Sequence, residues 1–248
     1  MGHRRRNRLR RLIAACLVVL ATTGAADDRS SNVRREVIGT SIQGREIEAI
    51  RIGTGIPVLI VGVIHGREEA GLAITDLLEQ MSPPSGVEWW IVPNMNPDGV
   101  AMNLRGNANR VDLNRNFPYQ WAPLGNKGYW QYAGPSRASE PETQAVVALV
   151  RRVKPVFGIW YHQDLNIISP STGLEGRLRR TYASLTGLPM KRITGGTYTG
   201  VAGTWQRRAH PRGMTMIVEL GPTLDATQAQ THADAVVTVS ELLHSQWK

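Results

Sequence analysis

The sequence holds one cysteine in 248 residues, and that residue, Cys16, lies in an apolar segment near the N-terminus. The rest of the chain cannot form a disulfide bond within itself, which excludes a small disulfide-stapled domain. A chain of this length must instead be stabilised by a buried apolar core. The length fits one α/β domain or at most two small ones.

Long apolar runs are also scarce, and Leu12 to Ala21 is too short to span a bilayer as a permanent anchor. Arginines precede this run, and small residues follow it as far as Ala26. Basic, apolar and small residues in this order are typical of a secretory signal peptide. We therefore expect residues 1–26 to be a leader and residues 27–248 to form one domain, secreted or held in the periplasm or cell envelope.

The N-terminus has two less favoured interpretations. A lipid attachment motif would use Ile13-Ala14-Ala15-Cys16, but the apolar run continues after Cys16 instead of preceding it. A disordered basic arm is the other interpretation. The pair Arg10-Arg11 matches a twin-arginine signal poorly, so the sequence leaves both the export route and the cleavage site open.

An excess of acidic or basic residues is missing once the leader is set aside. The whole chain has 29 Lys and Arg against 20 Asp and Glu. Six arginines and no acidic residue lie in the leader, so residues 27–248 carry a net charge of only +3. No basic cluster interleaved with aromatic residues remains, and we expect no nucleic acid partner.

The most informative stretch is His65-Gly66-Arg67-Glu68. The apolar run Pro57 to Ile64 precedes it and is typical of a buried strand, whereas helical spacing follows it from Glu69 to Gln80. His65 and Glu68 thus lie where a strand gives way to a helix. An imidazole nitrogen and a carboxylate oxygen are both good Zn²⁺ ligands, although such a pair alone is a weak signal.

Two further polar residues follow buried strands. The apolar run Pro155 to Tyr161 is followed by His162, and Met214 to Val218 by Glu219. Strands alternating with helices predict an α/β fold with helices on both faces of a parallel or mixed sheet. Since function gathers at the carboxyl ends of strands in such sheets, we expect these residues to meet.

The combination suits a catalytic zinc site, which needs three protein ligands and an open position for water. His65, Glu68 and His162 would supply two imidazoles and a carboxylate. Bound zinc makes water a nucleophile near neutral pH, and a general base beside the metal takes the proton of that water. Buried Glu219 would be this base. Singly, His162 and Glu219 also fit ordinary structural roles in a strand end, a cap or an ion pair.

A polar stretch from Met102 to Pro118 has neither helical nor strand periodicity, and long irregular stretches inside a domain are usually functional. Arg105 and Arg115 are candidates for holding an oxyanion. Asn114 with Arg115 would clamp a carboxylate, because arginine binds planar anions bidentately. The alternative is a solvated loop in which Arg115 pairs with Asp112.

Farther along, Ser139-Glu140-Pro141-Glu142 has the pattern of a helix capping box. The pattern predicts Ser139 as the N-cap residue and Glu142 at the third helical position. It favours a structural role for Glu140 and Glu142. A closing helix is predicted over Thr227 to Trp247.

These motifs together resemble the zinc metallocarboxypeptidase family, and they occur in the family's order from about residue 40 onward. The matching segments are His65-Gly66-Arg67-Glu68, Asn94-Met95-Asn96-Pro97-Asp98-Gly99, Val111-Asp112-Leu113-Asn114-Arg115-Asn116-Phe117-Pro118, Ser139-Glu140-Pro141-Glu142-Thr143, His162 after a strand, and Ile217-Val218-Glu219-Leu220-Gly221.

The resemblance implies a three-layer α/β/α sandwich with a mixed, twisted central sheet. It implies one zinc ion per chain, held by His65, Glu68 and His162, with Glu219 as the general base. It further implies that Arg105 polarises the substrate carbonyl. Asn114 and Arg115 would bind the terminal carboxylate of the substrate, and we expect a monomer.

Within the family, the small size and the segment Arg105-Gly106-Asn107-Ala108 are similar to compact bacterial murein peptide amidases. That similarity implies cleavage between γ-D-glutamate and meso-diaminopimelate in cell-wall peptides. Tyr198 lies closer to Trp205 than the family's mobile tyrosine does to its tryptophan, so its role is not carried over. No acid lies between Thr199 and Trp205, which disfavours a simple Lys/Arg carboxypeptidase. A carboxypeptidase for ordinary peptides and a non-catalytic peptidoglycan- or peptide-binding module remain alternatives.

Overall fold

The computed structural model describes residues 33–247, so the expected leader lies outside the described residues. The strands are β1 (Val33–Thr40), β2 (Glu46–Gly53), β3 (Gly55–Val63), β4 (Gly86–Asn94), β5 (Phe157–Gln163), β6 (Ile167–Ile168) and β7 (Met214–Leu220). The helices are α1 (Gly71–Glu79), α2 (Pro97–Ala101), α3 (Pro141–Val153), α4 (Gly173–Thr186), α5 (Ala202–Gln206) and α6 (Ala226–Gln246), with 3₁₀ turns η1 (Leu113–Arg115) and η2 (Arg207–Ala209).

Within residues 33–247, the strands form one sheet in the order β1-β2-β4-β3-β5-β7-β6. The central strands β4, β3, β5 and β7 pair in parallel, as expected for strands joined by helical crossovers. The strands β1, β2 and β6 pair antiparallel to their neighbours. The sheet is therefore mixed, as the sequence predicts.

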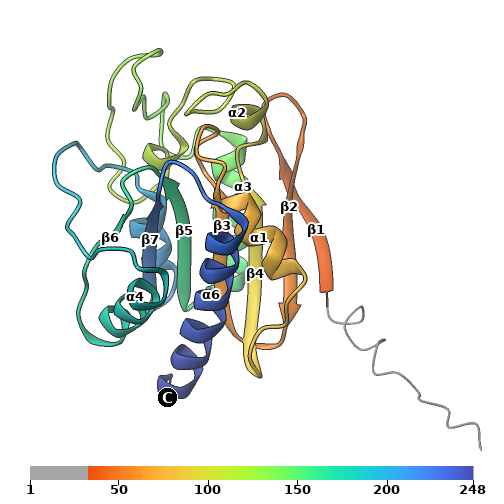
Figure 1. The fold of residues 1–248 in the computed structure, drawn as a ribbon. Helices are drawn as coiled ribbons and strands as arrows, with labels where there is room; N and C mark the ends of the chain where they lie inside the picture. Colours follow the sequence, from red (N-terminus) through yellow and green to blue (C-terminus); the bar gives the residue numbers. More distant parts are fainter. Residues whose placement is uncertain (1–32, 248) are drawn as a thin grey trace, which may run out of the picture.

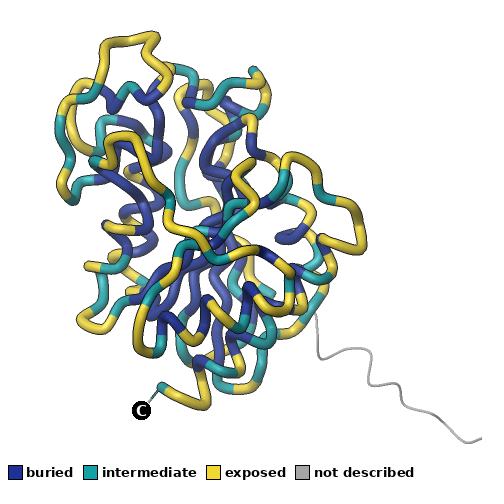
Figure 2. Tube along the Cα trace, turned by 60° about the vertical axis from the view of Figure 1, so that its left-hand side comes forward, coloured by how far each residue is buried: buried dark blue, intermediate teal, exposed yellow. Residues whose placement is uncertain are grey.

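Helices cover both faces of this sheet (Figure 1). Helices α1, α4 and α6 lie on one face, and α3 lies on the other. The central strands β3, β4 and β5 are mostly buried, whereas the edge strand β1 is half-buried or exposed along its length; Figure 2 shows the buried segments inside the molecule. The predicted three-layer α/β/α arrangement is confirmed.

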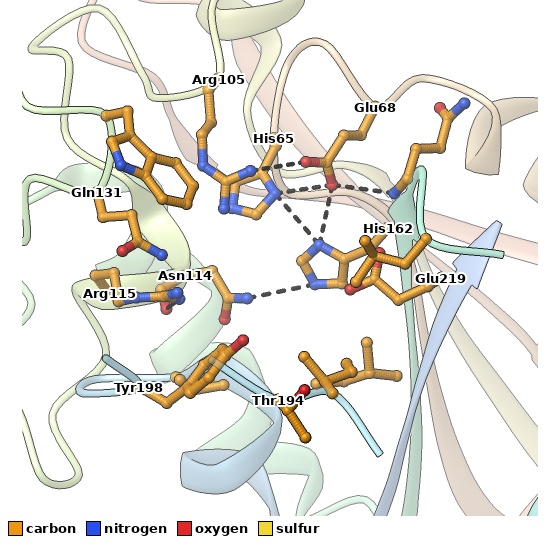
Figure 3. A pocket seen from close by; sticks show the side chains of 16 residues that line it. His65, Glu68, Arg105, Asn114, Arg115, Gln131, His162, Thr194, Tyr198 and Glu219 are labelled. Atoms are coloured by element: carbon orange, nitrogen blue, oxygen red, sulfur yellow. Dashed lines mark hydrogen bonds and ion pairs between the residues drawn. The ribbon is translucent and has the colours of Figure 1, made fainter. Parts of the chain in front are cut away.

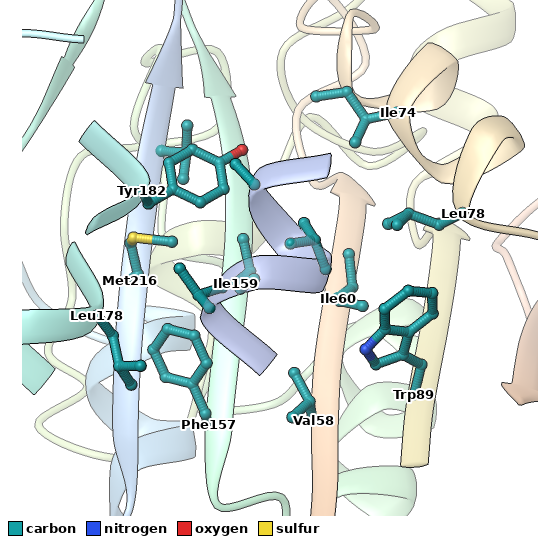
Figure 4. Packing of buried hydrophobic residues seen from close by; sticks show 14 of the residues in the cluster. Val58, Ile60, Ile74, Leu78, Trp89, Phe157, Ile159, Leu178, Tyr182 and Met216 are labelled. Carbon is teal, nitrogen blue, oxygen red and sulfur yellow. The ribbon is translucent and has the colours of Figure 1, made fainter. Parts of the chain in front are cut away.

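The larger core lies between the sheet and helices α1, α4 and α6. Figure 4 shows side chains of α1 and α4 facing side chains of the strands in this core. The residues are Ile74, Leu78, Leu178 and Tyr182 from the helices, and Val58, Ile60, Trp89, Phe157, Ile159 and Met216 from the strands. Each large apolar side chain buried there contributes about 1.5–3 kcal/mol to folding. This packing fixes the strands whose carboxyl ends carry the site.

One polar residue, His232 on α6, is buried beside this core. The Tyr182 hydroxyl lies 2.8 Å from Nδ1 of His232 and 2.9 Å from the Tyr161 hydroxyl. Burial lowers the pKa of His232 to about 4, because a charged imidazolium is disfavoured away from water. The imidazole is therefore held neutral and hydrogen-bonded within the apolar layer.

The capping box predicted at Ser139 is wrong. The N-cap residue of α3 is Glu140, and no side chain caps this helix end. Ser139 Oγ instead donates to Glu140 Oε1 at 2.6 Å. The structural role of Glu140 and Glu142 holds for another reason, because the Asn107 side chain donates to both carboxylates. They tie the polar loop to α3.

The predicted ends of two strands are each two residues too early. The sequence places His162 and Glu219 just after strands, but both lie inside them, one residue before the ends of β5 and β7. The parallel pairing between β5 and β7 continues to Gln163 and Leu220, and this carries the strands through the polar residues. Within residues 33–247, none of the helices combines the length and the apolar character needed to cross a membrane.

Candidate active site

His65 and Glu68 lie in the turn between β3 and α1. The N–H of Glu68 donates to the His65 carbonyl at 2.9 Å, which closes the turn. A Cβ on Gly66 would lie 2.0 Å from the carbonyl carbon of Gly99, so only glycine permits this close approach. The Asn96 amide donates to the Ile64 carbonyl at 3.0 Å and fixes the same turn from the neighbouring loop.

His162 and Glu219 are brought together by the register of the sheet. They are direct partners in the parallel pairing of β5 and β7. Since residues at the same level of adjacent strands have their side chains on the same face, both point to one side of the sheet. Figure 3 shows Glu219 next to His162, and His65 and Glu68 approaching from the β3 end.

Three side-chain atoms converge at this point. His65 Nδ1 lies 2.8 Å from Glu68 Oε2, and His162 Nδ1 lies 3.0 Å from the same oxygen. The two imidazole Nδ1 atoms are 3.2 Å apart. His65, Glu68 and His162 thus form a group that could hold a metal ion.

Asp112 supports this group from behind. Its Oδ1 lies 2.9 Å from His65 Nε2, and its Oδ2 accepts a hydrogen bond from Arg105 Nε at 3.2 Å. Arg105 Nη1 donates to Glu68 Oε1 at 2.8 Å. The carboxylate of Asp112 therefore fixes the ring of His65 with Nδ1 facing the cluster. Within residues 33–247, no salt bridge joins the side chains of Asp112 and Arg115, although the Arg115 backbone N–H donates to the Asp112 carbonyl at 2.8 Å.

The charges in this cluster favour a cation. Burial acts to raise the pKa of Glu68, but the His65 and His162 imidazoles reverse this effect and hold the pKa well below its usual range. The pKa of buried Asp112 is likewise held low, mainly by His65. Burial lowers the pKa of His65, but the two carboxylates outweigh burial and raise it. Both carboxylates are therefore ionised around a position that attracts positive charge.

One cavity of about 320 Å³ contains all the predicted site residues. Its walls include His65, Glu68, Arg105, Asn114, Arg115, Trp130, Gln131, His162, Ile193, Thr194, Tyr198, Val201, Ile217 and Glu219. Burial raises the pKa of Glu219, which suits a carboxylate that has to accept a proton near neutral pH. The Glu219 carboxylate is thus available at the wall beside the cluster.

Asn114 and Arg115 lie on the 3₁₀ turn η1, and both are buried. Arg115 uses Nε and Nη1 to donate to the carbonyls of Thr197 and Asn114, at 3.0 and 2.8 Å. Its Nη2 makes no hydrogen bond to a described residue. Asn114 Oδ1 accepts from the Ala202 N–H at 3.0 Å, which fixes the orientation of this amide. Asn114 Nδ2 lies 3.4 Å from His162 Nε2, so one N–H of this amide remains for an anion in the cavity, and Arg115 keeps its Nη2 group.

A match to the zinc carboxypeptidase family covers residues 21–171 of the chain. The chain belongs to this family of hydrolases. The match includes His65, Glu68, Arg105 and His162, and it ends before β7, which carries Glu219. The resemblance seen in the sequence motifs is confirmed.

Curated relatives of the chain include bacterial amidases. The chain is 32% identical to murein peptide amidase A of Escherichia coli strain K12 over 158 residues, which are 59% of this chain and 64% of the relative. It is 28% identical to murein peptide amidase A of Vibrio campbellii over 192 residues, 73% of this chain and 76% of the relative. The alignment therefore spans slightly less than two thirds of the Escherichia coli relative.

Solved structures agree on the fold. The murein-tripeptide amidase of Escherichia coli O157 matches with a TM-score of 0.67 and 25% identity, over 83% of this chain and 91% of that chain. Carboxypeptidase A from Helicoverpa armigera matches with a TM-score of 0.72 and 19% identity, over 88% of this chain and 70% of that chain. The second likeness shows the carboxypeptidase-like fold alone.

The residues fit the zinc ion that the family implies. A Zn²⁺ ion at ~2 Å from each of three tetrahedral ligands separates the ligand atoms by roughly 3.3 Å. The observed separations of 2.8, 3.0 and 3.2 Å need only small outward movements. Zinc-bound histidines usually donate their other ring N–H to a carboxylate, and Asp112 Oδ1 lies 2.9 Å from His65 Nε2 in that position. The donor set and its support both fit zinc.

Sequence reasoning missed Gln131. Its side chain lines the cavity beside Arg115 and Asn114 (Figure 3), and the residue is only 5% exposed. It makes no hydrogen bond to a described residue, and its amide atoms are accessible from the cavity. Nothing in the irregular stretch around it distinguishes Gln131 from a solvated loop residue.

Tyr198 also lies at the cavity, and it is 52% exposed. The Arg115 guanidinium lies 5.1 Å from the centre of its ring. Among the described residues that line the cavity, Glu68 and Glu219 are the acidic ones. Glu68 belongs to the metal-ligand cluster, and Glu219 lies beside it. The cavity thus offers no separate acid for a basic substrate side chain, as the sequence predicts.

Proposed function

We propose that this chain is a zinc-dependent peptidase that acts as a monomer. It hydrolyses an amide bond next to a free carboxylate. The observation that carries the proposal is one shared cavity. The metal-ligand cluster, Glu219, and the pair Asn114 and Arg115 all line it. When Asn114 and Arg115 bind a terminal carboxylate, the amide bond next to that carboxylate is placed at the site where water is activated.

In this proposal, His65, Glu68 and His162 would hold a zinc ion, which would activate a water molecule for attack. Glu219 accepts the proton of that water at its carboxylate and passes it to the leaving amine. Arg105 faces the carbonyl of the scissile bond through its remaining Nη2 and stabilises the developing negative charge. Asn114 and Arg115 hold the leaving group's carboxylate.

We assign Gln131 to the same carboxylate. Its amide lies beside Arg115, where the surrounding charge is positive, so an N–H donor there suits the anion better than a carbonyl oxygen does. A carboxylate has lone pairs for more than two donors. Gln131 thus acts as a further donor of the clamp.

The most specific substrate we propose is the bond between γ-D-glutamate and meso-diaminopimelate in murein peptides. Support comes from the curated relatives named murein peptide amidase A and from the structural likeness to a murein-tripeptide amidase. The lack of a separate acid in the cavity agrees with a substrate that is not a simple C-terminal Lys or Arg peptide.

The test is metal content and activity measured on one preparation of residues 27–248. The zinc per chain is determined first. Hydrolysis of L-Ala-γ-D-Glu-meso-diaminopimelate is then followed before and after chelation, with zinc added back. About one zinc per chain and chelator-sensitive release of diaminopimelate are expected.

Other outcomes separate the alternatives. Turnover of ordinary peptides with a free C-terminus, without release of diaminopimelate, would replace the murein substrate by ordinary peptides. Zinc binding with tight peptide binding but no turnover of any substrate would favour the binding module. A chain that binds no zinc and is active with chelator present would overturn the proposed chemistry.

We further propose that the protein is exported, with residues 1–26 removed. The order of basic, apolar and small residues supports this. Mass spectrometry of the protein from culture medium, periplasm and cytosol of an expressing bacterium checks it. An N-terminus near residue 27 outside the cytosol is expected, and an intact cytosolic chain starting at Met1 would contradict export.

A further inference from the structure

A second hollow of about 200 Å³ adjoins the active-site cavity and shares Arg105 and Trp130 with it. We call it the arginine groove and define it by Arg67, Arg110, Tyr129 and Trp130, which line it. Its composition indicates a ligand.

The groove carries two positive charges without a carboxylate partner among the described residues. The Arg67 guanidinium donates through Nε to the Asn103 carbonyl at 2.6 Å, which leaves its Nη groups free. Arg110 is exposed and makes no ion pair with any residue of the described range 33–247. None of the described residues that line the groove is acidic. By contrast, the charge of Arg105 is balanced by Glu68 and Asp112.

The position of Arg110 is fixed by a tight turn. Its N–H donates to the Asn107 carbonyl at 2.8 Å, and its φ of 62° lies in the left-handed region, where glycine is the least strained residue. An arginine at such a position costs conformational energy, and strained residues cluster at ligand sites. Beside it, Tyr129 and Trp130 are exposed at 43% and 60%, and the Arg105 guanidinium lies 5.2 Å from the Trp130 ring centre.

The position of the arginine groove next to the active-site cavity indicates which part of a substrate would reach the groove. If the leaving group's carboxylate lies at Asn114 and Arg115 and the scissile carbonyl at Arg105, the acyl part continues past Arg105. The arginine groove begins there, because Arg105 and Trp130 form the boundary between the two hollows. This step rests on the proposed function.

We propose that the arginine groove binds a carboxylate on the acyl side of the scissile bond. Guanidinium groups pair with carboxylates through charge-assisted hydrogen bonds, and the aromatic rings cover the aliphatic part of the acyl group. In the proposed murein substrate this carboxylate is the α-carboxylate of D-glutamate, which stays free because the chain runs through the γ-carboxyl. The enzyme thus binds one carboxylate on each side of the bond that it cleaves.

The test compares two tripeptides that differ in this one group. The first is L-Ala-γ-D-Glu-meso-diaminopimelate, and the second carries a carboxamide in place of the glutamate α-carboxylate. The wild-type protein is expected to show at least tenfold higher kcat/KM with the free acid. Arg110→Gln should reduce this preference to below threefold, whereas Arg110→Lys should retain part of it. Arg67→Gln should act in the same direction.

Arg151→Gln is the matched control. Arg151 is an exposed arginine in the last turn of α3, at the opposite end of that helix from Glu140. The same loss of charge there should leave the preference for the acid unchanged. Equal kcat/KM for the two tripeptides in the wild type would overturn the proposal, and so would an equal loss with both in Arg110→Gln.

Binding measured without turnover separates this proposal from the proposed function. The zinc-loaded Glu219→Gln variant is titrated with both tripeptides by calorimetry, with and without Arg110→Gln. Tighter binding of the acid that depends on Arg110 supports the groove even if neither tripeptide is hydrolysed by the wild type. Equal binding of acid and amide, or no binding of either, overturns the groove whatever the hydrolysis assay shows.

Discussion

His65 Nε2 lies 2.9 Å from Asp112 Oδ1, and both side chains are buried. The contact fixes which imidazole nitrogen faces the cluster, because Nε2 donates its proton to the carboxylate and Nδ1 keeps its lone pair for a metal ion. The two residues are 47 positions apart in the sequence. The link between the polar loop and the β3 turn therefore orients a ligand.

Replacing Asp112 tests this role. Asp112→Asn keeps the size of the side chain but removes the charge, so the imidazole is a weaker ligand and its tautomer is no longer fixed. We expect zinc affinity to fall by roughly 10- to 100-fold. Competition with a chromogenic chelator measures it, with Asp76→Asn on the exposed face of α1 as control. Unchanged affinity in Asp112→Asn would show that the carboxylate is only structural.

Glu219→Gln separates proton transfer from metal binding. The substitution preserves the shape of the side chain and removes the base, so kcat should fall by at least 100-fold. Zinc per chain and the affinity for the tripeptide should stay within about threefold of wild type. Atomic absorption, calorimetry and steady-state kinetics on one preparation measure all three. Substantial remaining turnover would assign the proton transfer to another group.

The pH dependence of the wild type follows from the same carboxylate. Because burial raises the pKa of Glu219 above its ordinary value of 4.5, the group is protonated at a higher pH than an exposed glutamate. The value of kcat/KM should therefore decrease as pH falls toward 4.5, with its acid limb above that pH. Zinc content is measured at each pH to exclude metal loss. Full activity at pH 4.5 would contradict Glu219 as the base.

Gln131 is expected to act on substrate binding. Gln131→Ala removes the N–H donor from the carboxylate, so KM should rise roughly tenfold with little change in kcat. Gln131→Glu places a negative charge beside the bound anion and should raise KM further. The exposed Gln230 of α6, changed in the same two ways, is the control. A lower KM in Gln131→Glu would mean that this side chain faces an ammonium group.

His232 predicts how stability depends on pH. Its pKa is about 4 in the folded protein and 6.5 as the ordinary value, so the unfolded chain binds a proton over this range while the folded chain does not. Stability attributable to this group is complete above pH 6.5 and is lost as pH falls toward 4. Between pH 7.5 and 5 the loss is about 2 kcal/mol.

The comparison with His232→Gln isolates this contribution. A glutamine oxygen can still accept from Tyr182, and it does not titrate. Denaturant unfolding at pH 7.5 and 5 should show about 2 kcal/mol less loss of stability in His232→Gln than in wild type. His244→Gln, at an exposed position of the same helix, should behave like wild type. An equal loss in all three proteins would contradict the buried neutral state.

Much of the fold follows from local sequence patterns. The apolar run before His65 and the helical spacing after it predict β3 and α1, because these periods reflect which residues are buried. The same reasoning fails at Ser139, where the pattern of a capping box is present but the structure uses Glu140 as N-cap. Asn107, far away in sequence, engages the Glu140 and Glu142 carboxylates, and a local pattern cannot show this competition.

The sequence by itself predicted the candidate metal ligands, the proposed base and the two arginines, since each stands in a recognisable local motif. Only the tertiary structure decided how they meet. The register between β5 and β7 sets His162 beside Glu219, and the return of the polar loop brings Asp112 to His65 and Gln131 to Arg115. These relations depend on backbone pairing and loop closure between distant segments, which no local periodicity encodes. The arginine groove belongs to the same class, because Arg67, Arg110 and Trp130 lie close together only in the folded chain.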